Sequence, residues 1–172
     1  MLMKDQVAIV TGAASLRGIG WATAQRFAQE GARVALIDLD AQAASAAARE
    51  IGEAHRGYAC DVRDEAACRE TVARILADFG AVDVLVNNAG VSQPHRILDS
   101  TQDDYNLVMD SSVRGTYNMS RAVVPGMRAR RSGAIVCIGS VAAQRGGGIL
   151  GGPHYSAAKG AVQSMAKAMA RE

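Results

Sequence analysis

The stretch that decides the fold is Thr11-Gly12-Ala13-Ala14-Ser15-Leu16-Arg17-Gly18-Ile19-Gly20. It follows an apolar run of strand length, Val7–Val10, and leads into an amphipathic segment, Gly18–Gln29. Glycines let the backbone turn tightly and approach a pyrophosphate, and free amides at a helix start face the anion. The order strand, glycine-rich turn, helix therefore predicts a dinucleotide-binding α/β fold. Taken alone, the glycine pattern also fits a plain strand-to-helix turn.

The rest of the chain repeats the alternation of strand and helix. The predicted strands are Val7–Val10, Arg33–Ile37, Gly57–Cys60, Val82–Val86 and Ala134–Ile138. The predicted helices are Gly18–Gln29, Ala41–Ile51, Glu65–Phe79, Asp103–Met109 with Val113–Arg130, and Tyr155–Arg171, with Gly31, Gly52 and Gly80 as C-terminal caps. The strands are short and almost continuously apolar, as expected for parallel strands covered on both faces. The pattern predicts a doubly wound parallel sheet, a Rossmann fold, with residues 1–172 as one domain.

The composition excludes several classes of protein. Of the 172 residues, 49% are hydrophobic and 21% are charged, which is typical of an α/β protein and not of a disordered chain. The formal net charge of +2 is too small to favour nucleic acid or a membrane surface as a partner. Cys60, Cys68 and Cys137 have no metal-binding spacing, so we expect free thiols, no metal and a cytoplasmic location.

Asp38 ends the second predicted strand, 18 residues after Gly20. An acid at this place in a dinucleotide-binding fold accepts hydrogen bonds from the adenosine ribose hydroxyls. The same carboxylate repels a 2′-phosphate, so NAD(H) is favoured over NADP(H). Arg17 instead favours NADP(H), because a cation in the glycine loop could reach a phosphate. Asp40 is interpreted as the N-cap of the next helix.

The segment Tyr155-Ser156-Ala157-Ala158-Lys159 places a phenol and an ammonium on one face of a predicted helix. A cation beside a phenol favours the phenolate, which makes the hydroxyl a usable proton donor or acceptor nearer neutral pH. Such pairs also occur on ordinary solvated helix faces. Ser140, however, ends the fifth predicted strand, at the edge where open α/β sheets bind ligands. Together with the glycine loop, these residues point to hydride transfer.

With these motifs the chain resembles the short-chain dehydrogenase/reductase family along essentially its whole length. The family's loop reads TGxxxGxG, and Leu16-Arg17 resembles a two-residue insertion before Gly18. Cys60-Asp61-Val62 resembles the family's Asp-Val pair, whose side chain and amide contact adenine. Asn87-Asn88-Ala89-Gly90 resembles its NNAG motif, which stabilises the sheet beside the cofactor.

The resemblance implies a set of site residues. Those expected to bind the cofactor are Gly12, Ser15, Arg17, Gly18, Ile19, Gly20, Asp38, Leu39, Asp61, Val62, Asn88, Ala89, Gly90, Tyr155 and Lys159. In the family's mechanism, Ser140 hydrogen-bonds the substrate oxygen, Tyr155 exchanges the proton, and Lys159 holds the nicotinamide ribose and lowers the pKa of the phenol. Ser112 is expected to act as the fourth catalytic residue. It stands where the family has an Asn that supports a water linked to the Lys, and its hydroxyl can hold the same water or another one.

The sequence thus predicts an NAD(H)-dependent oxidoreductase that interconverts a secondary alcohol and a ketone of a small molecule. The loops Ser92–Ile97 and Gln144–His154 are expected to form the substrate wall, with His95 at its mouth and His154 as a plain loop residue. By resemblance, the helices Val113–Arg130 and Tyr155–Arg171 pair across the subunits of a homodimer or homotetramer.

Two alternatives to this function remain. A 3-oxoacyl-(acyl-carrier-protein) reductase would use NADP(H) and a basic landing patch, whereas the cluster Arg128, Arg130 and Arg131 is interpreted as complementing a helix dipole. A non-catalytic dinucleotide-binding module is the other alternative. Family members normally continue with two more strands and a substrate-covering segment. A protein that ends at Glu172 is therefore expected to expose its fifth strand, to bind adenine nucleotide weakly and to turn over poorly.

Overall fold

The computed structural model describes residues 1–147 and 151–172. In chain order the elements are β1 (Val7–Thr11), α1 (Ile19–Gln29), β2 (Arg33–Asp38), α2 (Ala41–Ile51), β3 (Arg56–Ala59), α3 (Glu65–Phe79), β4 (Val84–Asn87), α4 (Gln102–Met109), the π-helical turn η1 (Asp110–Arg114), α5 (Gly115–Arg130), β5 (Ala134–Cys137), α6 (Ala142–Arg145) and α7 (Pro153–Met169).

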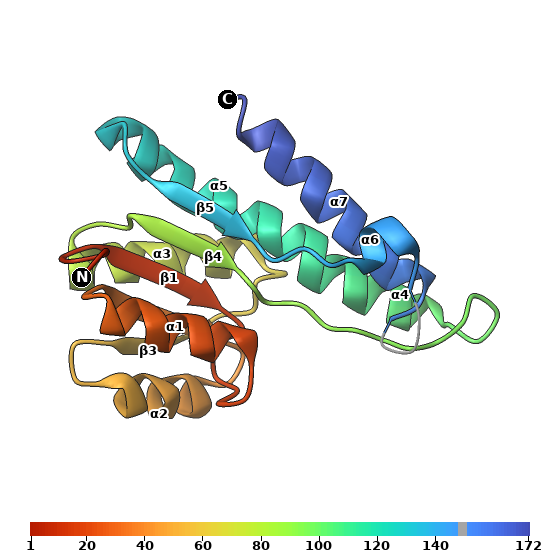
Figure 1. Cartoon of the computed structure of the whole chain (residues 1–172), viewed down its shortest axis with the longest axis horizontal. Helices are drawn as coiled ribbons and strands as arrows, with labels where there is room; N and C mark the ends of the chain where they lie inside the picture. The colour runs from red at the N-terminus through yellow and green to blue at the C-terminus, as the bar shows by residue number, and fades with distance from the viewer. Residues whose placement is uncertain (148–150) are drawn as a thin grey trace.

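The five strands form one parallel sheet in the order β3-β2-β1-β4-β5 (Figure 1). The chain first winds outward from β1 to β3 and then begins again on the other side of β1 with β4. The point where the strand order reverses therefore lies between β1 and β4, and ligands of open α/β sheets bind at this point. This topology confirms the predicted doubly wound Rossmann fold.

Two hydrophobic cores cover the two faces of the sheet. Alternate strand residues point to opposite faces, because the side-chain period of a strand is two. The core formed with α3 and α5 includes Ile9, Ile37, Leu85, Ile75 and Met119. The core formed with α1 and α2 includes Val10, Leu36, Val86, Ala24 and Ala47. The central strands are thus buried on both sides, which explains their continuous apolar runs.

Burial falls sharply toward β5, which lies at one edge of the sheet. Val10, Val86 and Val136 pair in register across β1, β4 and β5 and so belong to one row. Their side chains are 0%, 2% and 44% exposed. Ile135 points to the opposite face and packs against the α3 and α5 core. As predicted, the fifth strand exposes apolar residues at the sheet edge.

The predicted elements are all present, with shifted boundaries. α7 begins at Pro153, before the predicted start at Tyr155, because proline suits the first position of a helix, where no amide bond is needed. His154 therefore lies in the first turn of α7, and the interpretation as a loop residue is wrong. The two helical segments predicted around Ser112 are continuous through η1.

The helix caps agree with those predicted from the sequence. Asp40 accepts hydrogen bonds from the amides of Gln42 and Ala43, as predicted for an N-cap. The three glycines expected after helices have positive φ angles: Gly31 (+92°), Gly52 (+140°) and Gly80 (+85°). The short helix α6 has no counterpart in the sequence prediction. Gly148, Ile149 and Leu150 of the expected substrate wall lie outside the described residues.

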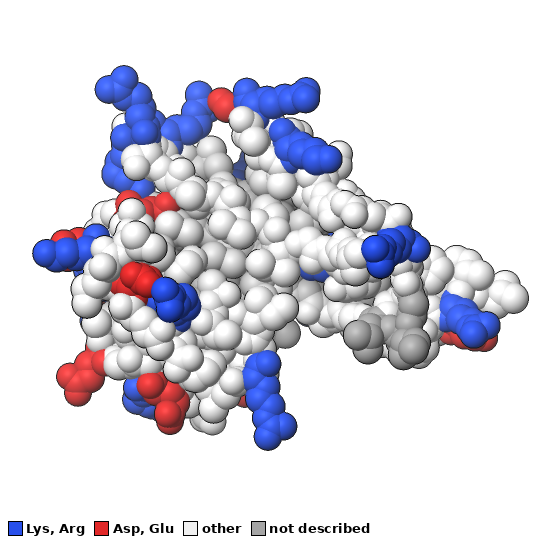
Figure 2. All heavy atoms as spheres, viewed as in Figure 1, with Lys and Arg blue, Asp and Glu red and all other residues white. Residues whose placement is uncertain are grey.

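Lys and Arg side chains form a group at one end of the face shown in Figure 2, whereas other charged side chains are scattered over it. Lys and Arg atoms cluster at the top of that view, where α5 ends in Figure 1. The last turn of α5 carries Arg128 and Arg130, in the position expected to complement the helix dipole. Arg130 also donates to the carbonyl of Val82 at 2.6 Å. Within residues 1–147 and 151–172, no helix combines the length and apolar character needed to cross a membrane.

Candidate active site

The glycine loop has no room for side chains at two positions. Gly12 has a φ of +63°, and a Cβ there would lie 2.9 Å from Cα of Ala89. A Cβ on Gly20 would lie 2.5 Å from both the Gly12 carbonyl oxygen and Nδ2 of Asn88. Real Cβ atoms do not approach backbone this closely, so each position requires glycine. The loop and the start of α1 are therefore packed directly against the segment after β4.

Asn88 and Ala89 tie the glycine loop to the segment after β4. Nδ2 of Asn88 donates to the carbonyls of Thr11 (2.8 Å) and Gly12 (3.0 Å). The Thr11 hydroxyl accepts from the amides of Asn88 (3.0 Å) and Ala89 (2.9 Å). These bonds fix the glycine loop after β1 relative to the segment after β4, on the two sides of the point where the strand order reverses.

The start of α1 is open to an anion. No side chain caps the helix at Gly18, whose amide bonds the carbonyl of Ser15 instead. Amides in the first turn of a helix carry partial positive charge and have no partner within the helix. Arg17 and Ile19 are exposed on either side of Gly18. The loop therefore fits the pyrophosphate of a dinucleotide.

Asp38 lies at the end of β2 and faces the glycine loop. One carboxylate oxygen accepts from the amide of Ala14 (2.9 Å) and the other from the amide of Leu39 (2.8 Å). The side chain of Leu39 is 66% exposed. The carboxylate is thus held between two backbone segments, with lone pairs left for further donors.

A cavity of about 300 Å³, here called the Asp38 cavity, opens beside this carboxylate. Its lining residues are Gly12, Ile37, Asp38, Leu39, Cys60, Asp61, Val62, Arg63, Ala89, Gly90, Val91, Leu107 and Ser111. The structure therefore gathers seven of the expected cofactor residues around one hollow. Its volume falls at the lower end of the range of small-molecule sites.

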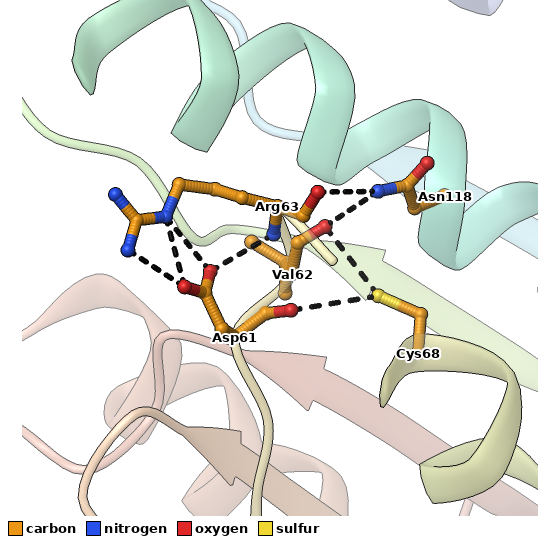
Figure 3. Close-up of polar contacts among 5 residues, drawn as sticks. All are labelled: Asp61, Val62, Arg63, Cys68 and Asn118. Carbon is orange, nitrogen blue, oxygen red and sulfur yellow. Dashed lines mark hydrogen bonds and ion pairs between the residues drawn. The ribbon is translucent and has the colours of Figure 1, made fainter. Parts of the chain in front are cut away.

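Arg63 is a cavity residue that the sequence analysis missed. Its guanidinium binds the carboxylate of Asp61 at 2.6 to 3.0 Å, and its amide bonds the same group at 3.0 Å (Figure 3). These hydrogen bonds lower the pKa of Asp61. Both side chains are partly exposed, so the pair adds little to stability. It does fix the direction of the Asp61 side chain.

Asn118 supports the same loop from α5. Its buried side-chain amide donates to the carbonyls of Val62 (2.9 Å) and Arg63 (3.2 Å), as Figure 3 shows. The loop after β3 is therefore held by a helix more than 50 residues further along the chain. Sequence reasoning had no signal for this contact, since Asn118 lies within an ordinary amphipathic helix.

Tyr155 and Lys159 lie one turn apart on α7. Lys159 is 6% exposed, and its ammonium donates to the carbonyl of Ile138 at 2.8 Å and lies 5.9 Å from the centre of the Tyr155 ring. Burial lowers the pKa of Lys159, because water no longer solvates the charge. The pair predicted from the sequence therefore combines a half-buried phenol with a buried lysine that reaches the carboxyl end of β5.

Ser140 lies on the same side, in the segment after β5. Its hydroxyl oxygen accepts from the amide of Ala142 at 3.1 Å, so the hydroxyl proton remains available to another acceptor. Gln163 of α7 donates to the Ser140 carbonyl at 3.2 Å. Lys159 and Gln163 thus attach the helix of Tyr155 to the segment of Ser140. Gln163 was not singled out in the sequence.

The π-helical turn η1 places Ser112 close to Lys159. Its side chain is 1% exposed, and within the described part of the chain its hydroxyl has no hydrogen-bond partner. A Cβ on Gly90 would lie 3.1 Å from Oγ of Ser112 and 3.7 Å from Nζ of Lys159. The hydroxyl and the ammonium therefore border the same space, and π-helical turns are common at functional sites.

A second cavity, of about 890 Å³, lies between the two loops expected to form the substrate wall. Its lining includes Pro94, His95, Arg96 and Ile97 from one loop and Gly146, Gly147, Gly151 and Gly152 from the other. The amide of Gly152 bonds the carbonyl of Gln93 at 2.8 Å. His95 lies at this cavity but is also paired with Asp104 at 2.9 Å. A further hollow of about 880 Å³ between α5 and α7 contains none of the expected site residues.

The fold is of the Rossmann type, with an open glycine loop and a buried lysine at the carboxyl edge of its sheet. The family described as short chain dehydrogenase matches residues 6–172. The chain belongs to the short-chain dehydrogenase/reductase family, whose members are oxidoreductases that bind NAD(P), and the resemblance noted from the sequence is confirmed.

Individual relatives agree with this assignment. An uncharacterized short-chain type dehydrogenase/reductase of Sinorhizobium fredii is 48% identical over the whole chain and 70% of its own length. A 3-oxoacyl-(acyl-carrier-protein) reductase of Vibrio harveyi is 36% identical over the whole chain and 69% of its own length. A sorbitol dehydrogenase of Cereibacter sphaeroides is 40% identical over 96% of the chain and 63% of its own length.

Proposed function

We propose that this protein is an NAD(H)-dependent dehydrogenase that interconverts a secondary alcohol and a ketone, with residues 1–172 acting as one binding and catalytic domain. The observation that carries the proposal is the buried ammonium of Lys159, bonded to the Ile138 carbonyl one turn from Tyr155. Burying the charge of a lysine costs free energy unless the charge is paired and hydrogen-bonded, so a buried lysine calls for a reason. A charged group kept at the ligand edge of the sheet, beside a phenol, is typical of a catalytic site.

In this mechanism, Ser140 donates its hydroxyl proton to the substrate oxygen while its own oxygen is held by the Ala142 amide. Tyr155 gives or takes the proton at that oxygen, and the nearby ammonium of Lys159 stabilises the phenolate. The nicotinamide, when bound, accepts or supplies the hydride. Ser112 borders the space beside Lys159, where a water could exchange protons with the ammonium.

The substitution Tyr155→Phe tests catalysis separately from binding. We expect turnover to fall by about 10²- to 10⁴-fold, because the general acid–base group is lost. Binding of NADH, measured by calorimetry, should be unchanged. Tyr105→Phe, at a tyrosine 45% exposed on α4, is the matched control. If both variants keep full activity, or if the unaltered protein oxidises no secondary alcohol while binding NADH, the non-catalytic binding module replaces this proposal.

The cofactor preference is proposed from Asp38. Its carboxylate is already directed into the cavity by two amides, where it can accept from ribose hydroxyls and repel a 2′-phosphate. We expect NADH to bind more tightly than NADPH, and Asp38→Ser to reduce or reverse the difference. Equal or tighter binding of NADPH by the unaltered protein would contradict the preference.

Reduction of 3-oxoacyl groups with NADPH is the second candidate. The similarity to the Vibrio harveyi reductase and the arginines at the end of α5 favour it. A comparison of a 3-oxoacyl thioester plus NADPH with a panel of secondary alcohols and polyols plus NAD decides between the two. The sorbitol dehydrogenase relative makes polyols the first substrates to include.

We also propose a homodimer or homotetramer formed through α5 and α7, and a cytoplasmic location. The two helices border the hollow of about 880 Å³ and carry apolar side chains there, such as Val124 of α5 and Met165 of α7. Light scattering of the purified protein tests the oligomeric state, and a monomer at all concentrations would contradict it.

A further inference from the structure

Two thiols lie in contact beneath the Asp38 cavity. Cys60 directly follows β3, and Cys68 is the fourth residue of α3. Their sulfur atoms are 3.9 Å apart, and the side chains are 6% and 0% exposed. The sequence analysis expected only separate free thiols, because the two residues have none of the usual paired spacing. The turn between β3 and α3 brings them together.

Both thiols are connected to residues of the proposed adenosine site. The amide of Cys60 bonds the carbonyl of Asp38 at 2.8 Å, and Cys60 itself lines the Asp38 cavity. Sγ of Cys68 contacts the carbonyls of Val62 (3.4 Å) and Asp61 (3.9 Å), as Figure 3 shows. A change at either sulfur is therefore transmitted to the backbone that carries Asp38, Asp61 and Val62.

We propose that Cys60 and Cys68 form a reversible oxidation site: a hydroperoxide that enters the Asp38 cavity converts them to a disulfide, and this disulfide and a bound dinucleotide exclude each other. The coupling to nucleotide rests on the proposed function, because it takes the Asp38 cavity as the adenosine site. The disulfide itself does not depend on that assignment.

The chemistry needs only the two thiols and the peroxide. Cys60 loses its proton, and its sulfur attacks one peroxide oxygen. The O–O bond breaks, leaving a sulfenic acid on Cys60 and releasing an alcohol or water. The Cys68 sulfur then attacks the sulfenic sulfur, the S–S bond forms, and water leaves. Two thiols are oxidised and one peroxide is reduced. A dithiol reductant reverses the reaction by exchange.

The surroundings of each thiol decide which one attacks the peroxide and which one attacks the sulfenic acid. The hydrogen bond between the two thiols lowers the pKa of Cys60, while the same contact and burial raise the pKa of Cys68. The thiolate is the reactive form of cysteine, so the residue that reaches the cavity is also the one that ionises more readily. Cys68, fully buried, is placed to resolve the sulfenic acid.

Formation of the bond requires movement. A disulfide has an S–S length of about 2.05 Å, so the sulfurs must approach by roughly 1.9 Å. Cys68 is anchored in α3, and the segment Cys60–Val62 is the part free of regular structure. We therefore expect this segment to shift toward α3, which withdraws Asp61 and Val62 from the cavity. A dinucleotide in the cavity would block both the entry of peroxide and this shift.

The experiment uses the full chain with Cys137→Ala, so that the pair supplies the only thiols. The reduced protein is treated with hydrogen peroxide, with and without NADH, and digested with trypsin. We expect the peptides Gly57–Arg63 and Asp64–Arg69 to be found joined by a disulfide. NADH should slow their joining. The oxidised protein should bind NADH about tenfold more weakly or worse, in the range of coupling between linked sites, and recover on reduction with dithiothreitol.

A second variant keeps the test decisive. Cys68→Ala should accumulate Cys60 sulfenic acid, which dimedone traps, with no joined peptides. If neither the disulfide nor the trapped acid forms before the protein unfolds, the two residues are ordinary packed thiols and the proposal is wrong. A disulfide that leaves NADH binding unchanged overturns the coupling. Failure of the reduced protein to bind NADH instead counts against the proposed function.

Discussion

The two halves of the sheet build their parts of the site in different ways. Around β1, β2 and β3 the site consists largely of backbone: two glycines without room for a side chain, uncapped helix amides, and amides that hold Asp38. Around β4 and β5 it consists of side chains from η1 and α7, attached to the segment after β5 by Lys159 and Gln163. The first half therefore depends on close packing, and the second depends on how α7 is held.

The same contrast appears in the core. The row Val10, Val86 and Val136 runs from full burial to 44% exposure across three neighbouring strands. Side chains of the inner strands, including Val86 of β4, are fixed by contacts on both faces of the sheet. Those of β5 have neighbours mainly on the α3 and α5 face. An equal change in the sequence will therefore have unequal effects in an inner strand and in the edge strand of the second half.

The largest effect is expected for Gly20→Ala. The new methyl group would lie 2.5 Å from the Gly12 carbonyl and from Asn88, so the loop and α1 must separate. We expect the free energy of unfolding to fall by about 1–3 kcal/mol and NADH binding to be lost. Urea denaturation and calorimetry measure the two effects. Unchanged values would show that the packing around Gly20 is looser than these distances imply.

A matched pair of substitutions tests the row of valines. Val86→Thr puts a hydroxyl into the buried core and should lower the free energy of unfolding by about 1–3 kcal/mol. Val136→Thr, in register on the next strand, should change it by less than about 0.5 kcal/mol. Both are read from urea denaturation. Equal losses would mean that β5 is as enclosed as β4 in solution and would remove the contrast.

Gly160→Ala should have a smaller effect of the opposite sign. Gly160 lies within α7, and no atom lies within 4 Å of where its Cβ would be. We expect the free energy of unfolding to rise by about 0.5–1 kcal/mol, because alanine loses less backbone entropy in a helix. Comparison with Gly20→Ala distinguishes a glycine that is needed because no side chain fits from one where a side chain has room. A loss of stability would reveal a contact on α7 in the native assembly.

The smallest change in stability near neutral pH is expected for Lys159→Met. Loss of the hydrogen bond to Ile138, about 1 kcal/mol, opposes the gain from no longer burying a charge. Because burial lowers the pKa of Lys159, the folded protein loses this proton at a lower pH than the unfolded chain. Wild type should therefore gain stability relative to the variant as the pH rises through the lowered value.

Urea denaturation between pH 7 and 10 checks the direction of this change. Lys167→Met, at an exposed lysine in the last turn of α7, controls for the loss of one positive charge. A difference between Lys159→Met and wild type that stays constant across this range would mean that the ammonium is well solvated, and the main support for the catalytic proposal would be removed.

Much of the fold could be predicted because its signals are local. Each strand is a run of apolar residues, and each glycine cap or Asp40 N-cap acts within a few positions. The grouping of seven expected residues around the Asp38 cavity could also be predicted, because parallel strands end at one edge of the sheet. The motif residues were therefore placed close together before their contacts were known.

The contacts that complete the site could not be predicted in the same way. Asn118 reaches the loop after β3 across 56 positions, and Gln163 reaches Ser140 across 23. Nothing in the composition of α5 or α7 marks these residues, because helix packing alone decides which side chain meets which carbonyl. The contact of Cys60 with Cys68 depends likewise on the angle between a strand and the next helix. The continuous passage from α4 through η1 to α5 was missed because a π-helical turn has no simple sequence pattern.

Under the proposed function, the two hydrogen bonds that the amides of Ala14 and Leu39 donate to Asp38 have a consequence for the affinity of the cofactor. A carboxylate already fixed in its binding direction has little freedom left to lose when a ribose arrives, so the entropic penalty of association is small. The ribose hydroxyls then need only add to a preorganised acceptor. Affinity gained in this way does not require deep enclosure of the nucleotide.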